Sequence, residues 1–117
     1  MPYGPDDGTL APWAVAASLP FAPEIVLPTL EHCSRTYPNV ENEYGLVCSF
    51  NPTFPSGGAG HSGWMSKDHF ALDQGPVVLM IENYQSGLIW RLMRSCSPVV
   101  TGLRRAGFTG GWLTGVG

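Results

Sequence analysis

Residues 77–81 constrain the fold more than any other part of the chain, because they form a run of five apolar residues, Val-Val-Leu-Met-Ile. Gly75 and Pro76 precede the run, and Glu82 follows it. Proline is favoured in the first turn of a helix, so we expect a helix that begins at Pro76 and ends at Gly87. A buried strand is the competing interpretation, but the residues after the run favour a helix. A helix that is apolar on every side belongs in a core.

Further helices are predicted from prolines that stand where a first turn would begin. Pro12, Pro23 and Pro98 each open such a segment, and Thr9 is a candidate N-cap before the first of them. Pro28 lies inside the second segment, where it either kinks the helix or marks its true start. The expected helices span residues 11–19, 23–35 and 98–106, while residues 90–94 extend the central helix or form a short one. The sequence therefore predicts an all-α fold.

Residues 38–72 are predicted to form a long irregular loop, because proline and glycine interrupt them repeatedly. A loop of this length in a compact domain is usually functional or disordered, and disordered segments seldom hold many aromatic residues. Aromatic rings with polar neighbours are typical of a sugar-binding rim. Rings that pin the loop to its own core are an equally good interpretation. The rings in question belong to Tyr44, Phe50, Phe54, Trp64 and Phe70.

Charged residues are scarce: six Lys and Arg with nine Asp and Glu make up 13% of the 117 residues, against about 25% in a typical soluble domain. The net charge of −3 excludes the basic surface that nucleic acid requires. No uncharged apolar run reaches the ~18–20 residues of a membrane span, and the first residues show no signal-peptide pattern. So few charges would cover an independent domain poorly, which indicates part of something larger.

The three cysteines, Cys33, Cys48 and Cys96, are odd in number and widely spaced. They form no Cys-x-x-Cys pair, and the three histidines complete no metal-binding motif. We therefore expect neither a metal nor a cofactor. The disulfide state stays open between free thiols in a reducing compartment and one disulfide with a spare thiol.

Two of the nine acidic residues, Asp73 and Glu82, stand close to the apolar run. A carboxylate inside a buried helix must be paired, hydrogen-bonded or protonated, and a buried protonated carboxyl can serve as a general acid. The structural alternative for Glu82 is a carboxylate held by an arginine or by a helix end. Within one continuous helix the two side chains would face opposite ways. With Pro76 at the helix start, Asp73 is expected outside the helix, and its direction is then free.

Six ordered blocks of sequence carry a resemblance to a known family. They are Asp7-Gly8-Thr9-Leu10-Ala11-Pro12; Ser18-Leu19-Pro20-Phe21-Ala22-Pro23-Glu24; Tyr44-Gly45 with Phe50-Asn51; Asp73-Gln74-Gly75-Pro76; Met80-Ile81-Glu82-Asn83-Tyr84 with Ser86-Gly87-Leu88 and Trp90; and Leu103-Arg104-Arg105-Ala106-Gly107-Phe108. In this order they resemble the C-terminal portion of the glycoamylase-like domain. That family includes bacterial endo-β-1,2-glucanases and is related to a domain of cyclic β-1,2-glucan synthases. The resemblance covers about residues 3–108 and leaves 109–117 as a frayed tail.

The resemblance implies a fold and an activity. The family fold is an (α/α)6 toroid whose inner helices line a sugar-binding cleft, so residues 1–117 would be a single partial domain, the C-terminal third of a toroid, with the long aromatic and Gly-rich loop. The implied activity is hydrolysis of a β-linked glucan, foremost β-1,2-glucan, by carboxylate acid/base catalysis, with Asp73 as the catalytic candidate. The implied substrate-binding residues are Asp7, Phe50, Asn51, Gln74, Glu82, Asn83 and Tyr84, and the aromatic loop adds Trp64 as a candidate.

Departures from the family pattern limit what the resemblance implies. Cys48-Ser49 stands before Phe50-Asn51 where the family tends to have Asp-Ala, and Gln85 follows Asn-Tyr where the family often has Arg. Residues 55–63 are also atypical. The N-terminal helices of the family, which supply further acidic residues, are absent, and glycoside hydrolysis needs two positioned carboxyl groups. The isolated chain is therefore expected to be inactive, with the second carboxyl elsewhere in the parent protein.

Two functions stay open at this point. The first is a fragment of a glycoside hydrolase whose partner is an oligo- or polysaccharide glucan. The alternative is a non-catalytic truncated helical module or carbohydrate-binding remnant, which as a fragment would self-associate through exposed apolar helix faces. Members of the family are often periplasmic or secreted, but the chain shows no leader that indicates a compartment.

Overall fold

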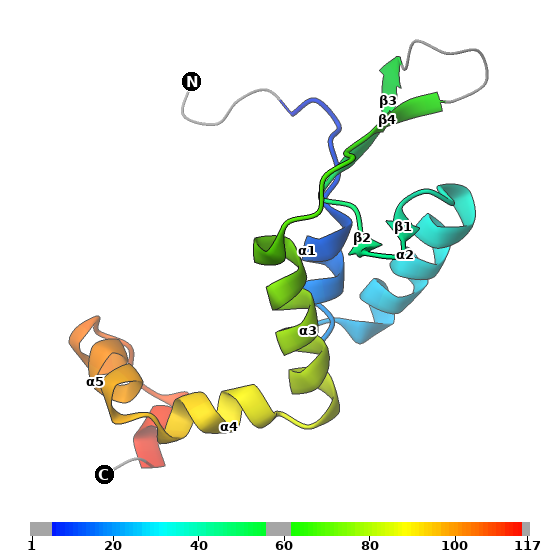
Figure 1. Ribbon diagram of the computed structural model, residues 1–117. Helices are drawn as coiled ribbons and strands as arrows, with labels where there is room; N and C mark the ends of the chain where they lie inside the picture. The colour runs from blue at the N-terminus through cyan, green and yellow to red at the C-terminus, as the bar shows by residue number, and fades with distance from the viewer. Residues whose placement is uncertain (1–5, 56–61, 116–117) are drawn as a thin grey trace. The chain divides into compact units, whose positions relative to one another are not determined.

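The computed structural model describes residues 6–55 and 62–115, and the chain divides into two compact units, residues 1–81 and 82–117. The first unit contains α1 (Pro12–Ala17), α2 (Pro23–Thr36), β1 (Glu41–Asn42), β2 (Gly45–Leu46), β3 (Phe50–Pro55), β4 (Ser62–Met65) and the greater part of α3 (Ala71–Gln85). The second contains the end of α3, α4 (Leu88–Ser95), α5 (Ser97–Arg105) and the 3₁₀ helix η1 (Gly111–Gly115). Figure 1 follows these elements along the chain.

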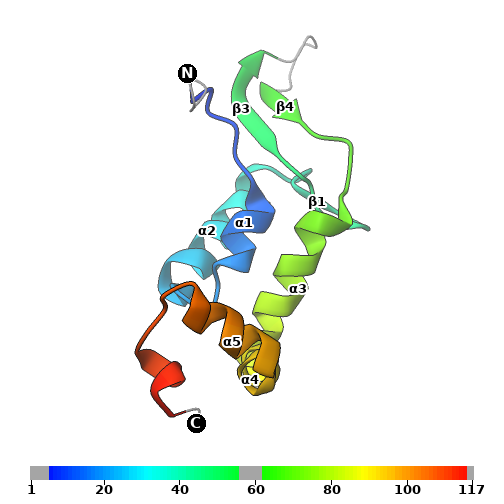
Figure 2. The ribbon, with the colours of Figure 1, turned by 90° about the vertical axis from the view of Figure 1, so that its left-hand side faces the viewer.

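The two N-terminal helices are confirmed as α1 and α2, which pack side by side (Figures 1 and 2). Each carries a proline in its first turn, where the missing N–H would have found no helical partner anyway. The predicted cap by Thr9 is wrong, because Ala11 occupies the N-cap position of α1 without a side-chain hydrogen bond. Pro28 lies inside α2 and does not mark its start.

The central helix α3 begins at Ala71 and not at Pro76, which it carries inside. The carbonyl of Phe70 accepts backbone hydrogen bonds from Asp73 (3.0 Å) and Gln74 (3.1 Å), and these bonds form the first turn ahead of the proline. The predicted start was wrong because Pro76 lies past the first turn of α3, where its missing N–H costs the hydrogen bond to the carbonyl of Leu72 but does not end the helix. Asp73 therefore lies in the first turn of α3, so its direction is set by the helix.

The apolar run of α3 is not enclosed on all sides within this chain. Val78 is 66% exposed and Leu79 is 47% exposed, and Leu72 in the first turn is 82% exposed. The prediction of a helix buried all round is wrong for the chain as it stands. An exposed apolar face of this kind is typical of a surface that another polypeptide covers.

The segment expected to be an irregular loop contains two antiparallel hairpins, so the all-α prediction is corrected to a mostly helical fold with two small sheets. In the first, Glu41 pairs with Leu46. In the second, Phe50 pairs with Met65 and Asn51 with Trp64 before the register shifts. The prolines and glycines in the segment are typical of a loop. Strand pairing could not be predicted from them, because each strand pairs with residues that are distant in the chain. Residues 56–61, which include the glycine cluster, lie outside the described residues.

The core of the first unit forms around Val40, Val47 and Phe50, which are 1%, 1% and 2% exposed. Cys33, Tyr37 and Met65 pack against this cluster. The N-terminal segment joins the second hairpin through two backbone hydrogen bonds between Leu10 and Phe50, of 2.7 and 2.9 Å. The core thus ties the end of α2, both hairpins and the N-terminal segment together, and the hairpin β3–β4 extends away from the helices (Figures 1 and 2).

The second unit is helical, as predicted. Gly87 has φ +68 and leads into α4, since glycine adopts the left-handed conformation without a steric penalty. The segment expected to fray contains η1, whose Trp112 ring lies under the guanidinium of Arg94 at 5.7 Å. Among the residues that the structure describes, no helix is long and apolar enough to cross a membrane.

Candidate active site

Asp73 is the most deeply placed carboxylate in the described residues, being 7% exposed in the first turn of α3. The helix N-terminus favours a negative charge there. The neighbouring Gln74 donates a hydrogen bond from Nε2 to the carbonyl of Leu46 at 2.8 Å, and a Cβ added at Gly45, which has φ +98, would lie 3.0 Å from Oε1 of Gln74. These contacts dock the first hairpin and the chain that follows it onto the first turn of α3.

Cys48 lies beside Asp73 because of this docking. A side-chain hydrogen bond with Asp73 is the main cause that raises the pKa of the Cys48 thiol, and burial raises it further. The negative charges of Asp73 and Asp68 act in the same direction, while a hydrogen bond with Ser49 opposes them. A raised pKa favours the protonated form of the thiol, which is the form that can donate to a carboxylate.

Two buried side-chain polar atoms lack a hydrogen-bond partner within the described residues: Oδ2 of Asp73 and Nδ1 of His69. Buried polar groups are normally paired, and leaving one unpaired costs about 1–3 kcal/mol. Asp73 lies in the first turn of α3, and His69 lies just before the helix, four residues away in sequence. Within the described residues, buried side-chain polar atoms without a partner therefore occur only around the start of α3.

The tautomer of a neutral His69 ring follows from its neighbours. Asn42 accepts a hydrogen bond from the backbone N–H of Tyr44 through Oδ1 (2.9 Å), which leaves its amide Nδ2 facing Nε2 of His69 at 3.0 Å. The amide can only donate, so Nε2 of a neutral ring accepts and Nδ1 carries the proton. The ring of Tyr44, 69% exposed, lies 5.7 Å from the imidazole. An aromatic ring thus lies beside an N–H donor that has no partner among residues 6–55 and 62–115.

Asn51, a predicted sugar contact, is a structural clamp with 1% exposure. Its Nδ2 donates to the carbonyl of Asp7 (2.7 Å) and to Oγ1 of Thr9 (3.3 Å). Its Oδ1 accepts from the backbone N–H and the hydroxyl of Thr53, at 2.9 and 2.8 Å. All four hydrogen-bonding positions of the amide are therefore used, and a contact with substrate would require breaking one of them.

Asp7 lies in the loop that Asn51 holds, and its Oδ1 accepts a hydrogen bond from the backbone N–H of Thr9 at 2.9 Å. Hydrogen bonds from the side chain and backbone of Thr9 lower the pKa of Asp7. The carboxylate is exposed, so it stays accessible to a ligand.

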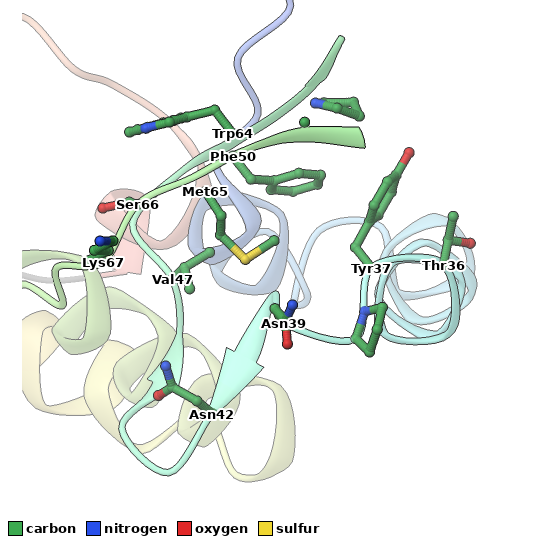
Figure 3. A pocket seen from close by; sticks show the side chains of 13 residues that line it. Thr36, Tyr37, Asn39, Asn42, Val47, Phe50, Trp64, Met65, Ser66 and Lys67 are labelled. Atoms are coloured by element: carbon green, nitrogen blue, oxygen red, sulfur yellow. The ribbon is translucent and has the colours of Figure 1, made fainter. Parts of the chain in front are cut away.

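A groove of about 860 Å³ opens between the end of α2, the first hairpin and the second hairpin. Figure 3 shows Tyr37 and Phe50 on its wall, with their ring centroids 5.0 Å apart. Trp64, 45% exposed, contributes to the lining, as do Asn39 and Lys67. Rings with a few polar groups are what a sugar-sized ligand requires, but Asp73 does not line this groove.

The other predicted sugar contacts differ in how exposed their side chains are and in the internal hydrogen bonds they make. Gln74 is committed to Leu46, as described. In the second unit, Asn83 is 6% exposed and accepts a hydrogen bond from the backbone N–H of Trp90 (3.0 Å), which fixes the start of α4. Glu82 accepts a hydrogen bond from the Ser86 hydroxyl, and the ring of Tyr84 is 48% exposed. Glu82 is nine residues beyond Asp73 on α3, so about 100° per residue puts the two on opposite sides of the helix.

Sequence reasoning missed Cys48, His69 and Asn42. Cys48 had a signal, since it stands at a family Asp position, but nothing in the sequence indicated that it meets Asp73. His69 and Asn42 come together only through the hairpin. No group of three or more His, Cys, Asp or Glu residues suited to a metal ion occurs within residues 6–55 and 62–115.

The family model described as "Putative glucoamylase" matches residues 1–97, and the chain belongs to this glycoamylase family. An exo-β-1,2-glucooligosaccharide sophorohydrolase (non-reducing end) of Parabacteroides distasonis is 34% identical over 106 residues, which are 90% of this chain and 14% of that protein. The predicted family resemblance is therefore confirmed.

Solved structures agree with this assignment. A "putative glucoamylase" from Bacteroides uniformis is 38% identical with a TM-score of 0.74, over 94% of this chain and 25% of that chain. An endo-β-1,2-glucanase from Chitinophaga pinensis, solved with sophorotriose and glucose, is 31% identical with a TM-score of 0.72, over 92% of this chain and 24% of that chain. The chain spans at most about a quarter of these relatives, as expected for a portion of such a domain.

Proposed function

We propose that this chain is part of a glycoside hydrolase that cleaves a β-linked glucan, with β-1,2-glucan as its substrate. The observation that carries the proposal is a buried carboxylate with an unpaired oxygen, Asp73, in a chain whose similar proteins are named for β-1,2-glucan hydrolysis. The shared helical fold supports the substrate class, and the state of Asp73 supports the acid/base chemistry.

Hydrolysis of a glycosidic bond needs one carboxyl group to protonate the leaving oxygen and a second to activate water or to attack the sugar. Asp73 is proposed for one of these roles, because Oδ2 has no partner in the described residues and can exchange a proton with a bound sugar. Glu82 does not complete the pair, since it faces the other side of α3. The second carboxyl group is proposed to come from the remainder of the parent domain.

The substrate contacts divide into two groups by exposure. Trp64 and Tyr84 present exposed rings, which suit stacking on pyranose faces, and Asp7 and Glu82 offer carboxylates that can accept sugar hydroxyls. The remaining proposed residues are proposed to support the fold of their own units, because their side chains are buried or committed to internal hydrogen bonds. They are Phe50, Asn51, Gln74 and Asn83.

The surrounding architecture is proposed to be an (α/α)6 toroid of which this chain supplies the C-terminal third. The exposed apolar residues of α3, Leu72, Val78 and Leu79, are where neighbouring helices of that toroid would pack. In the toroid these side chains would be buried, whereas in the isolated chain they form an exposed apolar surface.

A chimera tests the activity. This chain replaces the matching quarter of the Chitinophaga pinensis endo-β-1,2-glucanase, and the release of reducing sugar from β-1,2-glucan is measured with and without Asp73→Asn. Asparagine keeps the shape of the side chain and removes its acid/base function, so we expect a fall of about 10²–10⁴-fold in kcat. The matched control is Asp68→Asn, a nearby carboxylate outside the helix, for which activity stays within a few-fold. Full activity of the Asp73→Asn chimera would refute the catalytic assignment.

A second candidate function is a non-catalytic carbohydrate-binding or helical module, which the ring-lined groove of Figure 3 favours. Titration of the isolated chain with sophorotriose, with Trp64→Ala as the comparison, and size-exclusion chromatography separate the two. Glucan binding that depends on Trp64, together with self-association and no hydrolysis, supports the module. A monodisperse monomer that hydrolyses glucan by itself excludes it.

A further inference from the structure

His69 and Asp73 hold complementary hydrogen-bonding atoms that no other described residue uses. Nδ1 of the neutral His69 ring is a donor and Oδ2 of Asp73 is an acceptor, and both atoms are buried without a partner in the described residues. The carbonyl of Phe70, which follows His69, accepts the backbone N–H of Asp73 at 3.0 Å, so the two residues lie within one helical turn. Buried polar groups are normally paired, and an unpaired donor close to an unpaired acceptor indicates a ligand that offers both.

The fold fixes which nitrogen of His69 carries the proton. Oδ1 of Asn42 accepts from the backbone N–H of Tyr44 at 2.9 Å, so its Nδ2 faces Nε2 of His69 at 3.0 Å and donates to it. In water a neutral imidazole carries its proton mainly on Nε2, which is the opposite arrangement. The hydrogen bond from Gln74 to Leu46 (2.8 Å) holds the same hairpin against α3. The Nδ1–H donor is therefore built into the contact between the first hairpin and the start of α3.

Tyr44 gives this donor an aromatic neighbour that is open to solvent. It lies in the turn between β1 and β2, it is 69% exposed, and its ring centroid lies 5.7 Å from that of the imidazole. His69 itself is partly exposed. Exposed side chains change rotamer within nanoseconds, so a ligand can reach Nδ1 through a movement of the Tyr44 ring, without unfolding of the hairpin.

We propose that His69 and Tyr44 form a sugar-binding subsite beside Asp73. In this subsite Nδ1–H of His69 donates a hydrogen bond to a hydroxyl of the same glucosyl unit that Oδ2 of Asp73 contacts, and the Tyr44 ring packs on the pyranose. Asn42 is a positioning residue, because it acts through the tautomer of His69. The identity of the ligand as a glucan rests on the proposed function, whereas the tautomer is a property of this chain and is tested without substrate.

The tautomer is measured by ¹⁵N NMR on the full chain with His32→Gln and His61→Gln, which leave His69 as the single imidazole. At alkaline pH we expect a protonated Nδ1 and an unprotonated Nε2 in the native chain, and the opposite preference in denaturant. A protonated Nε2 in the native chain would overturn the assignment of Nδ1–H as the donor, and with it the subsite.

Sugar binding is measured on the same single-histidine chain with millimolar sophorotriose. We expect the Nδ1 resonance of His69 to shift on addition of the sugar. Tyr44→Phe keeps the ring and should preserve this response, whereas Tyr44→Ala should weaken it about threefold or more. An Nδ1 resonance that does not respond to sophorotriose would overturn the subsite.

Two variants of His69 separate contact with substrate from structural support in the chimera described above. Glutamine places an amide near the position of Nε2, where it can accept from Asn42, and leaves no donor at Nδ1. Asparagine places an amide near the position of Nδ1 and does not reach Asn42. We expect His69→Gln to lower kcat/KM for β-1,2-glucan about three- to tenfold, mainly through a higher KM, because a contact with bound substrate is lost. His69→Asn should keep kcat/KM within about threefold and should lower the melting temperature.

The reverse result, with His69→Gln equal to wild type and His69→Asn impaired, would assign His69 to support of the hairpin alone and overturn the subsite. This outcome leaves the proposed function standing as long as Asp73→Asn abolishes activity. Full activity of Asp73→Asn instead refutes the catalytic role of Asp73, while the tautomer and the response to sophorotriose still decide the subsite.

Discussion

Asn51 and Asp73 are both polar side chains enclosed by the first unit, with 1% and 7% exposure, yet they are used in opposite ways. The Asn51 amide fills all four of its hydrogen-bonding positions, with partners from the N-terminal segment and from its own strand. The Asp73 carboxylate keeps one oxygen without a partner in the described residues. A polar group that is fully satisfied stabilises the fold, whereas one that is left partly unsatisfied costs stability and is available for chemistry. Burial alone therefore does not identify a functional residue.

The largest effect on stability is expected at Asn51. Asn51→Ala leaves the N–H and hydroxyl of Thr53 and the carbonyl of Asp7 without their partner, so we expect a loss of about 2–4 kcal/mol in the free energy of unfolding. Urea denaturation of the isolated chain measures it, with Asn39→Ala as a control at a groove position. A loss below about 1 kcal/mol would show that the clamp is dispensable.

The hairpin that Asn51 belongs to has its own weak point at Gly63. This residue has φ +106, and a Cβ there would lie 2.8 Å from the Asn51 carbonyl oxygen and from Cα of Pro52. Both atoms belong to the backbone and cannot move aside, so Gly63→Ala should destabilise the chain by about 1–3 kcal/mol. Gly102→Ala, a helical site with nothing within 4 Å of the added carbon, is the matched control and should be neutral or stabilising. Thermal unfolding distinguishes the two.

Asp73→Asn tests the Asp73 half of the comparison with Asn51, through the free energy of unfolding. Because the carboxylate is not fully satisfied in the native chain, its replacement should change the free energy of unfolding by only about 1 kcal/mol or less, in contrast to Asn51→Ala. The same urea experiment measures both. A loss as large as that of Asn51→Ala would assign Asp73 a structural role and weaken the proposed chemistry.

The smallest effect is expected at Asp7, where the pKa is lowered by the Thr9 hydrogen bonds. A carboxyl group whose pKa is lower in the folded state contributes stability above its unfolded pKa, and loses that contribution as the pH falls through the folded value. Stability should therefore decline slightly more between pH 5 and the acid range in the wild-type chain than in Asp7→Asn. Melting temperatures measured against pH check this, and parallel curves would contradict it.

The helices were predictable because their signals are local. Prolines in the first turn and glycine after the last turn act on neighbouring residues, so α1, α2 and the helices of the second unit followed from the sequence. The start of α3 was misplaced because Pro76 was assigned to the first turn, whereas it lies past that turn and removes one helical hydrogen bond without ending the helix. The hairpins were missed because Pro52, Pro55 and the glycines resemble loop residues, while strand pairing depends on partners such as Leu10 and Met65 that are distant in the chain.

The sequence by itself determined the family and the helical character, since motif order and proline placement are readable along the chain. It also predicted Asp73 as the catalytic candidate, from a carboxylate next to an apolar run. Only the tertiary structure decided which polar groups are satisfied. It assigned Asn51 to structural support, brought Cys48 to Asp73 and left Oδ2 without a partner in the described residues. The physical reason is that hydrogen-bond satisfaction depends on atoms brought together from separate segments, which no local pattern specifies.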